Sequence, residues 1–167
     1  MITFVVPIHE WSHQAKICFD RLHKQLESNE IVVVADQCQL PDIPAKVVHT
    51  STRLYAAGSR NLGAKHATHD VIVFVDSDIL VPNNFVKHCE DNYNKDQSSI
   101  YCFPMGTEVT DSYTAGFKGM LELYSTHYLY DRPRDTIQQL QGYCCVITKK
   151  LLEKTGYWVE TRTMELE

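Results

Sequence analysis

Three short runs of β-branched apolar residues, at positions 2–6, 31–35 and 71–75, restrict most strongly how this chain can fold. Each run is nearly continuous rather than alternating, which is typical of strands that helices cover on both faces. Between the first two runs, one apolar stripe with helical spacing is formed by Trp11, Ala15, Cys18, Phe19, Leu22 and Leu26. Because strand, helix and strand in this order make a βαβ unit, we predict an α/β fold, a three-layer sandwich with a mainly parallel central sheet.

The rest of the chain continues this alternation. We expect strands at 46–49, 99–103 and 141–147, and helices at 55–68, after Pro82, at 117–128 and at 149–154, the last ended by Gly156. For the aromatic stretch 121–130 we expect a core-packed helix, with a place on the acceptor side or against a membrane surface as the alternatives. No repeat or long linker interrupts the 167 residues. We therefore expect a single domain, 1–167, with residues 1–98 and 99–167 as its two halves.

Charge restricts the partners. The formal net charge is -5, and no run of lysine or arginine stands out. Nucleic acid is therefore disfavoured as a partner, because binding a phosphate backbone needs a basic face. An anionic small molecule would need a bound cation or locally placed arginine and lysine to be held.

The six cysteines lie scattered in apolar stretches without CxxC spacing, so we interpret them as small core residues of a reducing compartment. The chain begins directly with a strand-like run, without a charged leader. No apolar stretch approaches the ~20 residues that cross a bilayer, so we expect no transmembrane segment. The expectation is a cytoplasmic protein, peripheral to a membrane at most.

The segment VIVFVDSDIL, residues 71–80, carries the clearest chemistry. Asp76 and Asp78 follow a buried strand directly, and residues i and i+2 of an extended chain point the same way, about 6.6 Å apart. Both carboxylates can therefore face one crevice at the carboxyl edge of the sheet, where open α/β folds bind ligands. Two hard oxygen donors suit Mg²⁺ or Mn²⁺, particularly when substrate phosphates complete the shell. The alternative is that both aspartates only cap a turn.

At this point the sequence resembles the inverting glycosyltransferases of family 2, which have the GT-A fold, over residues 1–160. Four blocks match in order: VVPIHE, EIVVVADQC, AAGSRNLGAKHATHDVIVFVDSD and GYCCVITKKLLEKTGYW. The third block is the most specific, because RN-G followed some fifteen residues later by FVDSD is rarely met by chance. The resemblance implies that 1–98 is the nucleotide-sugar-binding half and that 99–167 is part of the acceptor side.

The resemblance also implies roles for individual residues. The group expected to line the nucleotide comprises Pro7, Ile8, His9, Glu10, Asp36, Arg60, Asn61, Asp76 and Ser77. Within it, Asp36 would bind the base, and Arg60 and Asn61 would lie near the diphosphate and its sugar. Asp76 would meet the ribose and the metal, and Asp78 would be the direct metal ligand. Gly63 is interpreted as a packing contact.

The implied function is metal-assisted transfer of a sugar, with inversion, from a nucleoside-diphosphate sugar to an acceptor hydroxyl. We expect a UDP-sugar first and a GDP-sugar second, Mn²⁺ or Mg²⁺ as cofactor, and a saccharide or lipid-linked acceptor. The metal would neutralise charge on the leaving diphosphate, and a carboxylate would accept the acceptor's proton.

The general base of the reaction has no clear motif in this sequence. The family carries it in an acidic motif after the fourth block, whereas here the chain ends in TGYWVETRTMELE. Glu165 is a weak candidate, and more typical of a surface charge. The chain is then a truncated piece, a minimal member, or a module that binds nucleotide sugar without catalysis. A nucleotidyltransferase is a second alternative, although PIHEWSHQAK is not the Gly-rich basic loop of that chemistry.

Overall fold

The computed structural model describes residues 1–95, 100–102 and 144–158. By its internal contacts the chain divides into one unit of Met1–Tyr101 with Gly142–Glu167 and a second of Cys102–Gln141. The described helices, and all described strand residues apart from Cys102, belong to the first unit. The predicted helix at 117–128, the aromatic stretch 121–130 and Glu165 lie outside the described residues, and the single-domain prediction with its two halves stays a prediction.

The described strands form one sheet in the order β3-β2-β1-β4-β6-β5. Their bounds are β1 Ile2–Ile8, β2 Glu30–Asp36, β3 Lys46–Thr50, β4 Val71–Val75, β5 Tyr101–Cys102 and β6 Cys144–Thr148. The pairs β1–β2, β1–β4 and β2–β3 are parallel, and β4–β6 is antiparallel. The α/β fold with a mainly parallel sheet is thus confirmed.

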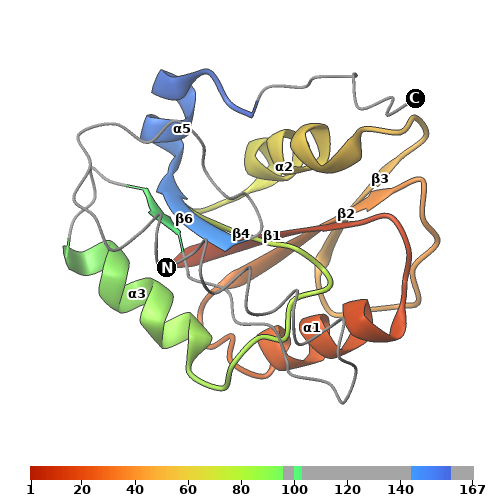
Figure 1. The fold of residues 1–167 in the computed structure, drawn as a ribbon, viewed down its shortest axis with the longest axis horizontal. Helices are drawn as coiled ribbons and strands as arrows, with labels where there is room; N and C mark the ends of the chain where they lie inside the picture. The colour runs from red at the N-terminus through yellow and green to blue at the C-terminus, as the bar shows by residue number, and fades with distance from the viewer. Residues whose placement is uncertain (96–99, 103–143, 159–167) are drawn as a thin grey trace, which may run out of the picture. The chain divides into compact units, whose positions relative to one another are not determined.

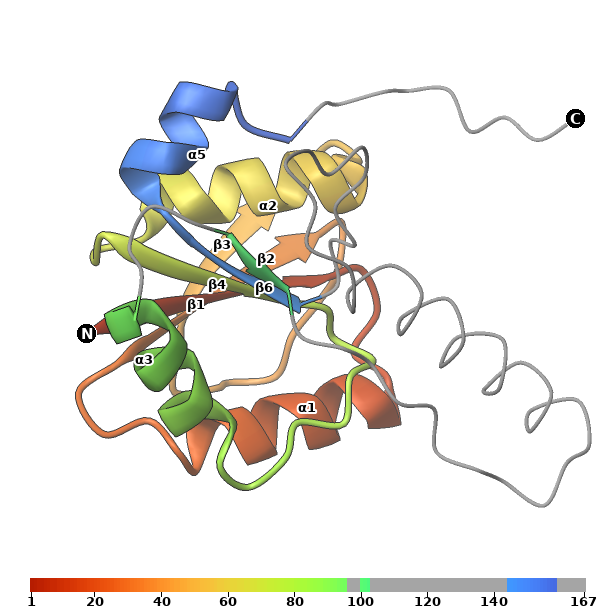
Figure 2. The same ribbon diagram turned by 60° about the vertical axis from the view of Figure 1, so that its left-hand side comes forward.

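Helices cover both faces of the sheet. The described helices are α1 His13–His23, α2 Tyr55–His66, α3 Phe85–Lys95 and α5 Lys149–Thr155. In both views α2 and α5 lie on one face, and α1 and α3 lie on the other (Figures 1 and 2). The predicted three layers are therefore present. No helix in the described part of the chain is long and apolar enough to span a membrane.

The end of α2 differs from its expected bound, and the start of α3 agrees with a helix after Pro82. α2 stops at His66 rather than at residue 68, because Thr68 donates its backbone N–H and its hydroxyl to the Glu30 carboxylate at 2.9 and 3.0 Å. α3 begins at Phe85, so Pro82 lies in the turn before the helix, where its carbonyl accepts from the Phe85 N–H at 3.2 Å.

The sheet's core is apolar on both faces, as the continuous runs predicted. All five residues of β4 are buried, as are Cys18, Cys89, Cys144 and Cys145. α2 approaches β1 at Gly63, where a Cβ would stand 2.2 Å from Cγ1 of Val5. The interpretation of Gly63 as a packing contact agrees with this approach.

Candidate functional site

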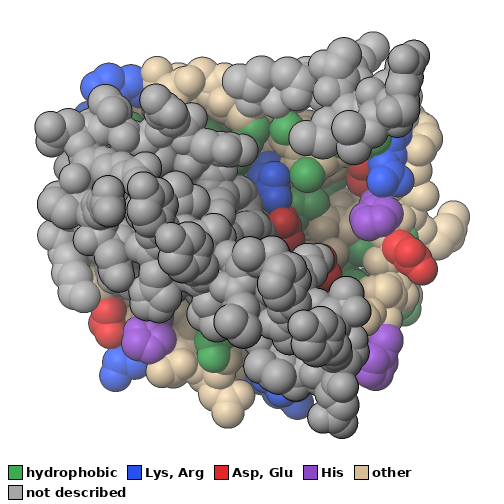
Figure 3. Space-filling view, viewed as in Figure 1, with side chains coloured by type: hydrophobic (Ala, Val, Ile, Leu, Met, Phe, Trp, Pro, Cys, Tyr) green, Lys and Arg blue, Asp and Glu red, His purple; other side chains and the backbone are tan. Residues whose placement is uncertain are grey.

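The carboxyl ends of the three neighbouring parallel strands β2, β1 and β4 lie at one edge of the sheet. The register pairs Ile8 with Ala35 and Val5 with Phe74, so the residues that follow these strands come together. A cavity of about 340 Å³ opens there. Its described lining is Pro7, Ile8, His9, Glu10, Ser12, Asp36, Arg53, Tyr55, Ala56, Ser59, Asp76, Ser77 and Asp78. Figure 3 shows acidic and basic side chains gathered in a hollow on this face.

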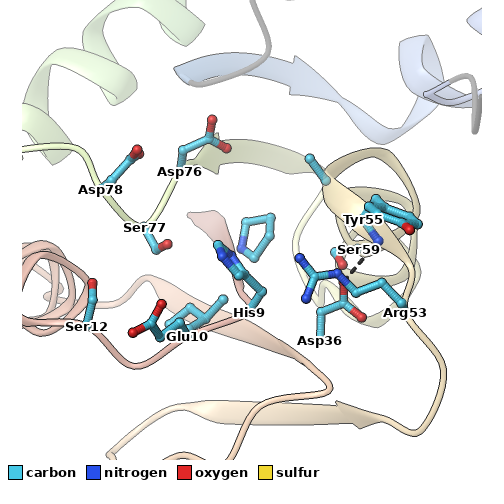
Figure 4. Close-up of a pocket in the computed structure, with 13 residues that line it drawn as sticks. His9, Glu10, Ser12, Asp36, Arg53, Tyr55, Ser59, Asp76, Ser77 and Asp78 are labelled. Atoms are coloured by element: carbon cyan, nitrogen blue, oxygen red, sulfur yellow. Dashed lines mark hydrogen bonds and ion pairs between the residues drawn. The ribbon is translucent and has the colours of Figure 1, made fainter. Parts of the chain in front are cut away.

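Asp76, Ser77 and Asp78 form one wall of the cavity. They follow β4 in a turn that is closed by the Ile79 N–H, which donates to the Asp76 carbonyl at 3.3 Å. In Figure 4 the two carboxylates extend to the same side of this turn, away from the Ser77 hydroxyl. Asp76 is half-buried and Asp78 is exposed. Both aspartates line the same cavity, and their role as metal ligands stays a prediction.

The electrostatics of this wall are dominated by negative charge. Burial raises the pKa of Asp76 above its ordinary value, the Arg60 guanidinium opposes that shift, and the charge of Asp78 adds to it. Beneath the turn, burial raises the pKa of the Cys18 thiol to about 12, with the charges of Asp78 and Asp76 adding to the effect. Arg60 thus compensates only part of the negative charge, and Cys18 stays protonated.

The donor set at this wall fits a hard divalent cation in part. Two carboxylates are oxygen ligands of the kind that Mg²⁺ and Mn²⁺ prefer. Among the described residues, no group of three or more His, Cys, Asp or Glu side chains is arranged to hold a metal ion. A cation here would therefore need oxygens from a ligand to complete its shell, which is what a diphosphate supplies.

Arg60 lies behind the wall rather than in the cavity lining. Its Nη2 donates to Oδ1 of Asp76 at 2.5 Å, and its guanidinium lies over the ring of Trp158, 5.1 Å from the centroid. Only 10% of the Arg60 side chain is exposed. The residue thus orients Asp76, and a direct contact with the diphosphate stays a prediction.

Asn61 is also turned away from the cavity. Its amide donates to the Trp158 carbonyl and accepts from the Trp158 N–H, both at 2.9 Å. The Trp158 ring meets Phe74 of β4 edge-on, with 5.6 Å between centroids. Asn61 therefore ties the segment after α5 to α2 and the sheet, which differs from the predicted place beside the donor sugar. Its contact with a donor stays a prediction.

Asp36, at the end of β2, holds the loop that enters α2. One of its carboxylate oxygens accepts from the Thr50 hydroxyl at 3.1 Å and from the Leu54 N–H at 2.9 Å, and the other accepts from the Tyr55 N–H at 2.9 Å. These bonds satisfy the N–H groups at the start of α2, which has no side-chain cap of its own. Asp36 lines the cavity as predicted, but its oxygens are already engaged by protein groups, and base binding stays a prediction.

No role was predicted for the residues around the start of α2, although three of them with polar side chains line the cavity. Arg53 lies 3.5 Å from Asp36 through Nε and over the ring of Tyr55 at 5.4 Å. Tyr55 is 63% exposed and has a φ of 57°, a left-handed backbone that is uncommon for an aromatic residue. Ser59 is the third. A cation and an aromatic residue before a helix whose N-terminus faces the strand ends were the signal that could have identified this wall.

The end of β1 supplies the floor. Pro7, Ile8, His9 and Glu10 all line the cavity, with His9 and Glu10 exposed, and their contact with a nucleotide stays a prediction. The chain then turns into α1, whose N-cap Ser12 accepts from the Ala15 N–H at 3.1 Å. This N-cap hydrogen bond places the start of α1 directly after the cavity floor.

Solved structures with the same fold are GT-A glycosyltransferases. A mannosyltransferase from Pyrobaculum calidifontis, in complex with GDP-Man and Mn²⁺, matches with a TM-score of 0.71 at 17% identity, over 95% of this chain and 47% of its own. S. aureus TarS in complex with UDP-GlcNAc matches with a TM-score of 0.65 at 19% identity, over 98% of this chain and 50% of its own. At these identities the likeness establishes the fold.

The sequence comparisons give the family. The model of glycosyl transferase family 2 matches residues 3–156, and the chain belongs to this family. An uncharacterized glycosyltransferase of Haemophilus influenzae is 29% identical over 86 residues, which are 47% of this chain and 29% of that protein. The chain thus spans under a third of this relative and about half of the matching structures.

Proposed function

We propose that this chain provides the donor site of a glycosyltransferase, which moves a sugar from a nucleoside-diphosphate sugar to an acceptor hydroxyl with inversion and with Mn²⁺ or Mg²⁺. One observation carries the proposal: Asp76 and Asp78 leave buried β4 together and face a cavity that the ends of β1 and β2 also line. Membership of glycosyl transferase family 2 supports the reaction class.

The charge of the cavity supports the metal requirement. Its described lining carries the carboxylates of Glu10, Asp36, Asp76 and Asp78 but only one guanidinium, that of Arg53. A diphosphate would be repelled by this surface, since like charges in a partly buried site interact strongly. A divalent ion held by the two aspartates would make the local charge favourable for phosphates, and it would neutralise charge on the leaving group.

The reaction itself breaks the bond between the anomeric carbon and the phosphate oxygen and forms one to the acceptor oxygen. Asp76 and Asp78 would hold a divalent cation, which would supply positive charge to stabilise the leaving diphosphate, and Arg60 keeps Asp76 oriented. The acceptor attacks from the face opposite the diphosphate, so the anomeric configuration inverts. Its hydroxyl proton passes to a carboxylate base, for which the sequence offers Glu165 as the candidate.

The donor is best sought among UDP- and GDP-sugars. One matching structure contains GDP-Man and another contains UDP-GlcNAc, which supports the class of nucleotide sugar. We keep the UDP-sugar as the first choice and a saccharide or lipid-linked molecule as the acceptor. A cytoplasmic protein, peripheral to the membrane at most, would meet both kinds of acceptor.

Release of nucleoside diphosphate from a panel of UDP- and GDP-sugars tests the proposal without a known acceptor, because water can replace it. With Mn²⁺ we expect slow release from one donor, and an anomeric product opposite in configuration to the donor. Binding without release would instead favour the non-catalytic module. Pyrophosphate release from a nucleoside triphosphate and a sugar phosphate would identify the nucleotidyltransferase and contradict the proposal.

A further inference from the structure

Ser59 carries a buried hydroxyl that has no protein partner in the described part of the chain. The residue is 1% exposed, and its Oγ makes no hydrogen bond there. A buried hydroxyl without a partner is unfavourable, and such groups in native proteins call for an explanation. Two other buried donors share this state, on Arg60 and Trp158, but of the three residues only Ser59 lines the cavity.

The position of Ser59 assigns it to one end of the cavity. Ser59 lies four residues after Tyr55 and three after Ala56 on α2, close to both on the helix surface, and all three residues line the cavity. Figure 4 draws Ser59 on the side of Asp36, Arg53 and Tyr55, across the cavity from Asp76 and Asp78. The hydroxyl is therefore remote from the wall that would hold the cation.

At this end of the cavity, Ser59 is the buried side chain whose polar atom has no partner in the described part of the chain. The oxygens of Asp36 already accept from Thr50, Leu54 and Tyr55. The guanidinium of Arg53 is paired with Asp36 and stacked on Tyr55. A ligand that reaches this end can therefore bond to Ser59 without displacing an existing protein contact.

We propose that Ser59 is an affinity-determining contact for the nucleoside part of the donor. With the diphosphate at Asp76 and Asp78, the nucleoside extends toward α2, and its base edge or a ribose hydroxyl completes the bonding of Ser59. This inference rests on the proposed function, since it needs a nucleoside diphosphate in the cavity.

Titration calorimetry in Mn²⁺ with UDP, GDP and inorganic pyrophosphate tests it. In Ser59→Ala, affinity for the preferred nucleotide should fall roughly three- to tenfold, the range of one hydrogen bond, whereas affinity for pyrophosphate should stay within twofold. Ser51→Ala is the matched control, because Ser51 is exposed and outside the cavity lining. An unchanged nucleotide affinity, or an equal loss for pyrophosphate, overturns the inference.

Thermal unfolding without ligand is a second test of whether the Ser59 hydroxyl has a structural partner. Removing an unpartnered hydroxyl from a helix interior should leave the melting temperature unchanged or raise it, since alanine is the better helix former. A lower melting temperature would mean that the hydroxyl has a structural partner, and would overturn the inference. Failure of wild type to bind either nucleotide refutes the proposed function as well, whereas wild-type binding that Ser59→Ala leaves intact refutes this inference alone.

Discussion

Arg60 and Asp76 form an ion pair of 2.5 Å that joins α2 to the end of β4. The pair is backed by Trp158, whose ring lies under the guanidinium and whose backbone is held by Asn61. The aspartate that faces the cavity is thus positioned by a contact that begins in the segment after α5. The Asp76 side chain in the cavity wall is thus linked through Arg60 to Trp158, a residue 82 positions further along the chain.

Arg60→Met should lower the free energy of unfolding by about 1–3 kcal/mol, because it leaves a half-buried carboxylate without its charged partner. Urea unfolding measures the difference. Lys16→Met is the matched control: it removes an exposed i, i+4 pair with the same 2.5 Å separation, and exposed pairs contribute at most about 0.5 kcal/mol. Equal effects of the two substitutions would show that Arg60 has no special role.

Asn61→Ala should release Trp158. Two buried hydrogen bonds of about 1 kcal/mol each are lost, so we expect about 2 kcal/mol of destabilisation. In a Trp11→Phe background the remaining fluorescence comes from Trp158, and its emission should shift to the red as the ring gains water. An unshifted emission maximum would mean that the aromatic contacts with Arg60 and Phe74 hold the segment by themselves.

Gly63→Ala should destabilise the fold by about 1–3 kcal/mol through overpacking, because its Cβ would meet Val5 at 2.2 Å. Gly156→Ala provides the comparison. A Cβ there meets nothing within 4 Å, but the φ of 85° is strained for alanine, so about 1 kcal/mol is expected. A larger loss at Gly156 than at Gly63 would contradict the close approach of α2 to β1.

Two carboxylates should give pH effects of opposite sign in the metal-free protein. The pKa of Asp76 is raised, so its contribution to stability is present below the unfolded pKa and is lost as pH rises through the folded pKa. Burial raises the pKa of Glu30, but the bonds from Thr68 and Thr3 and the charge of Lys46 lower it below the ordinary value overall. Its contribution is therefore lost as pH falls through the folded pKa.

Thermal unfolding from neutral to acidic pH separates these two effects. Asp76→Asn should remove the loss of stability that occurs as pH rises through the folded pKa of Asp76. Glu30→Gln should remove the loss of stability that occurs as pH falls through the folded pKa of Glu30. If both variants keep the wild-type dependence of melting temperature on pH, other groups control the pH dependence of stability.

The buried strands and the wall of Asp76 and Asp78 could be predicted because their signals are local. Continuous β-branched runs dictate a doubly covered sheet, and the i, i+2 spacing at a strand end dictates a shared direction. The contacts of Asn61, Asp36 and Tyr55 could not be read in this way. They depend on hydrogen bonds between residues that lie 97, 18 and 19 positions apart in the sequence. They also depend on the left-handed backbone of Tyr55, whose N–H donates to Asp36 at the end of β2.

The resemblance to family 2 was correct for the fold and the family, but it assigned Arg60 and Asn61 by motif position alone. In the structure both side chains contact Trp158, and Arg53, Tyr55 and Ser59 line the cavity. A contact of Arg60 or Asn61 with a donor stays a prediction. A motif fixes which residues share a helix. Which face of that helix meets the ligand depends on how the helix packs on the sheet.

Calorimetric titration of UDP and GDP, with Mn²⁺ and with EDTA, tests the central claim most directly. Binding should be present with the metal and should fall at least tenfold without it. Asp78→Asn should abolish the metal-dependent part while keeping the wild-type melting temperature, since Asp78 is exposed, and Asp42→Asn, at an exposed aspartate outside the cavity lining, should change neither. Equal affinity with Mn²⁺ and with EDTA, or an Asp78→Asn protein that binds as wild type does, would contradict a metal-dependent donor site.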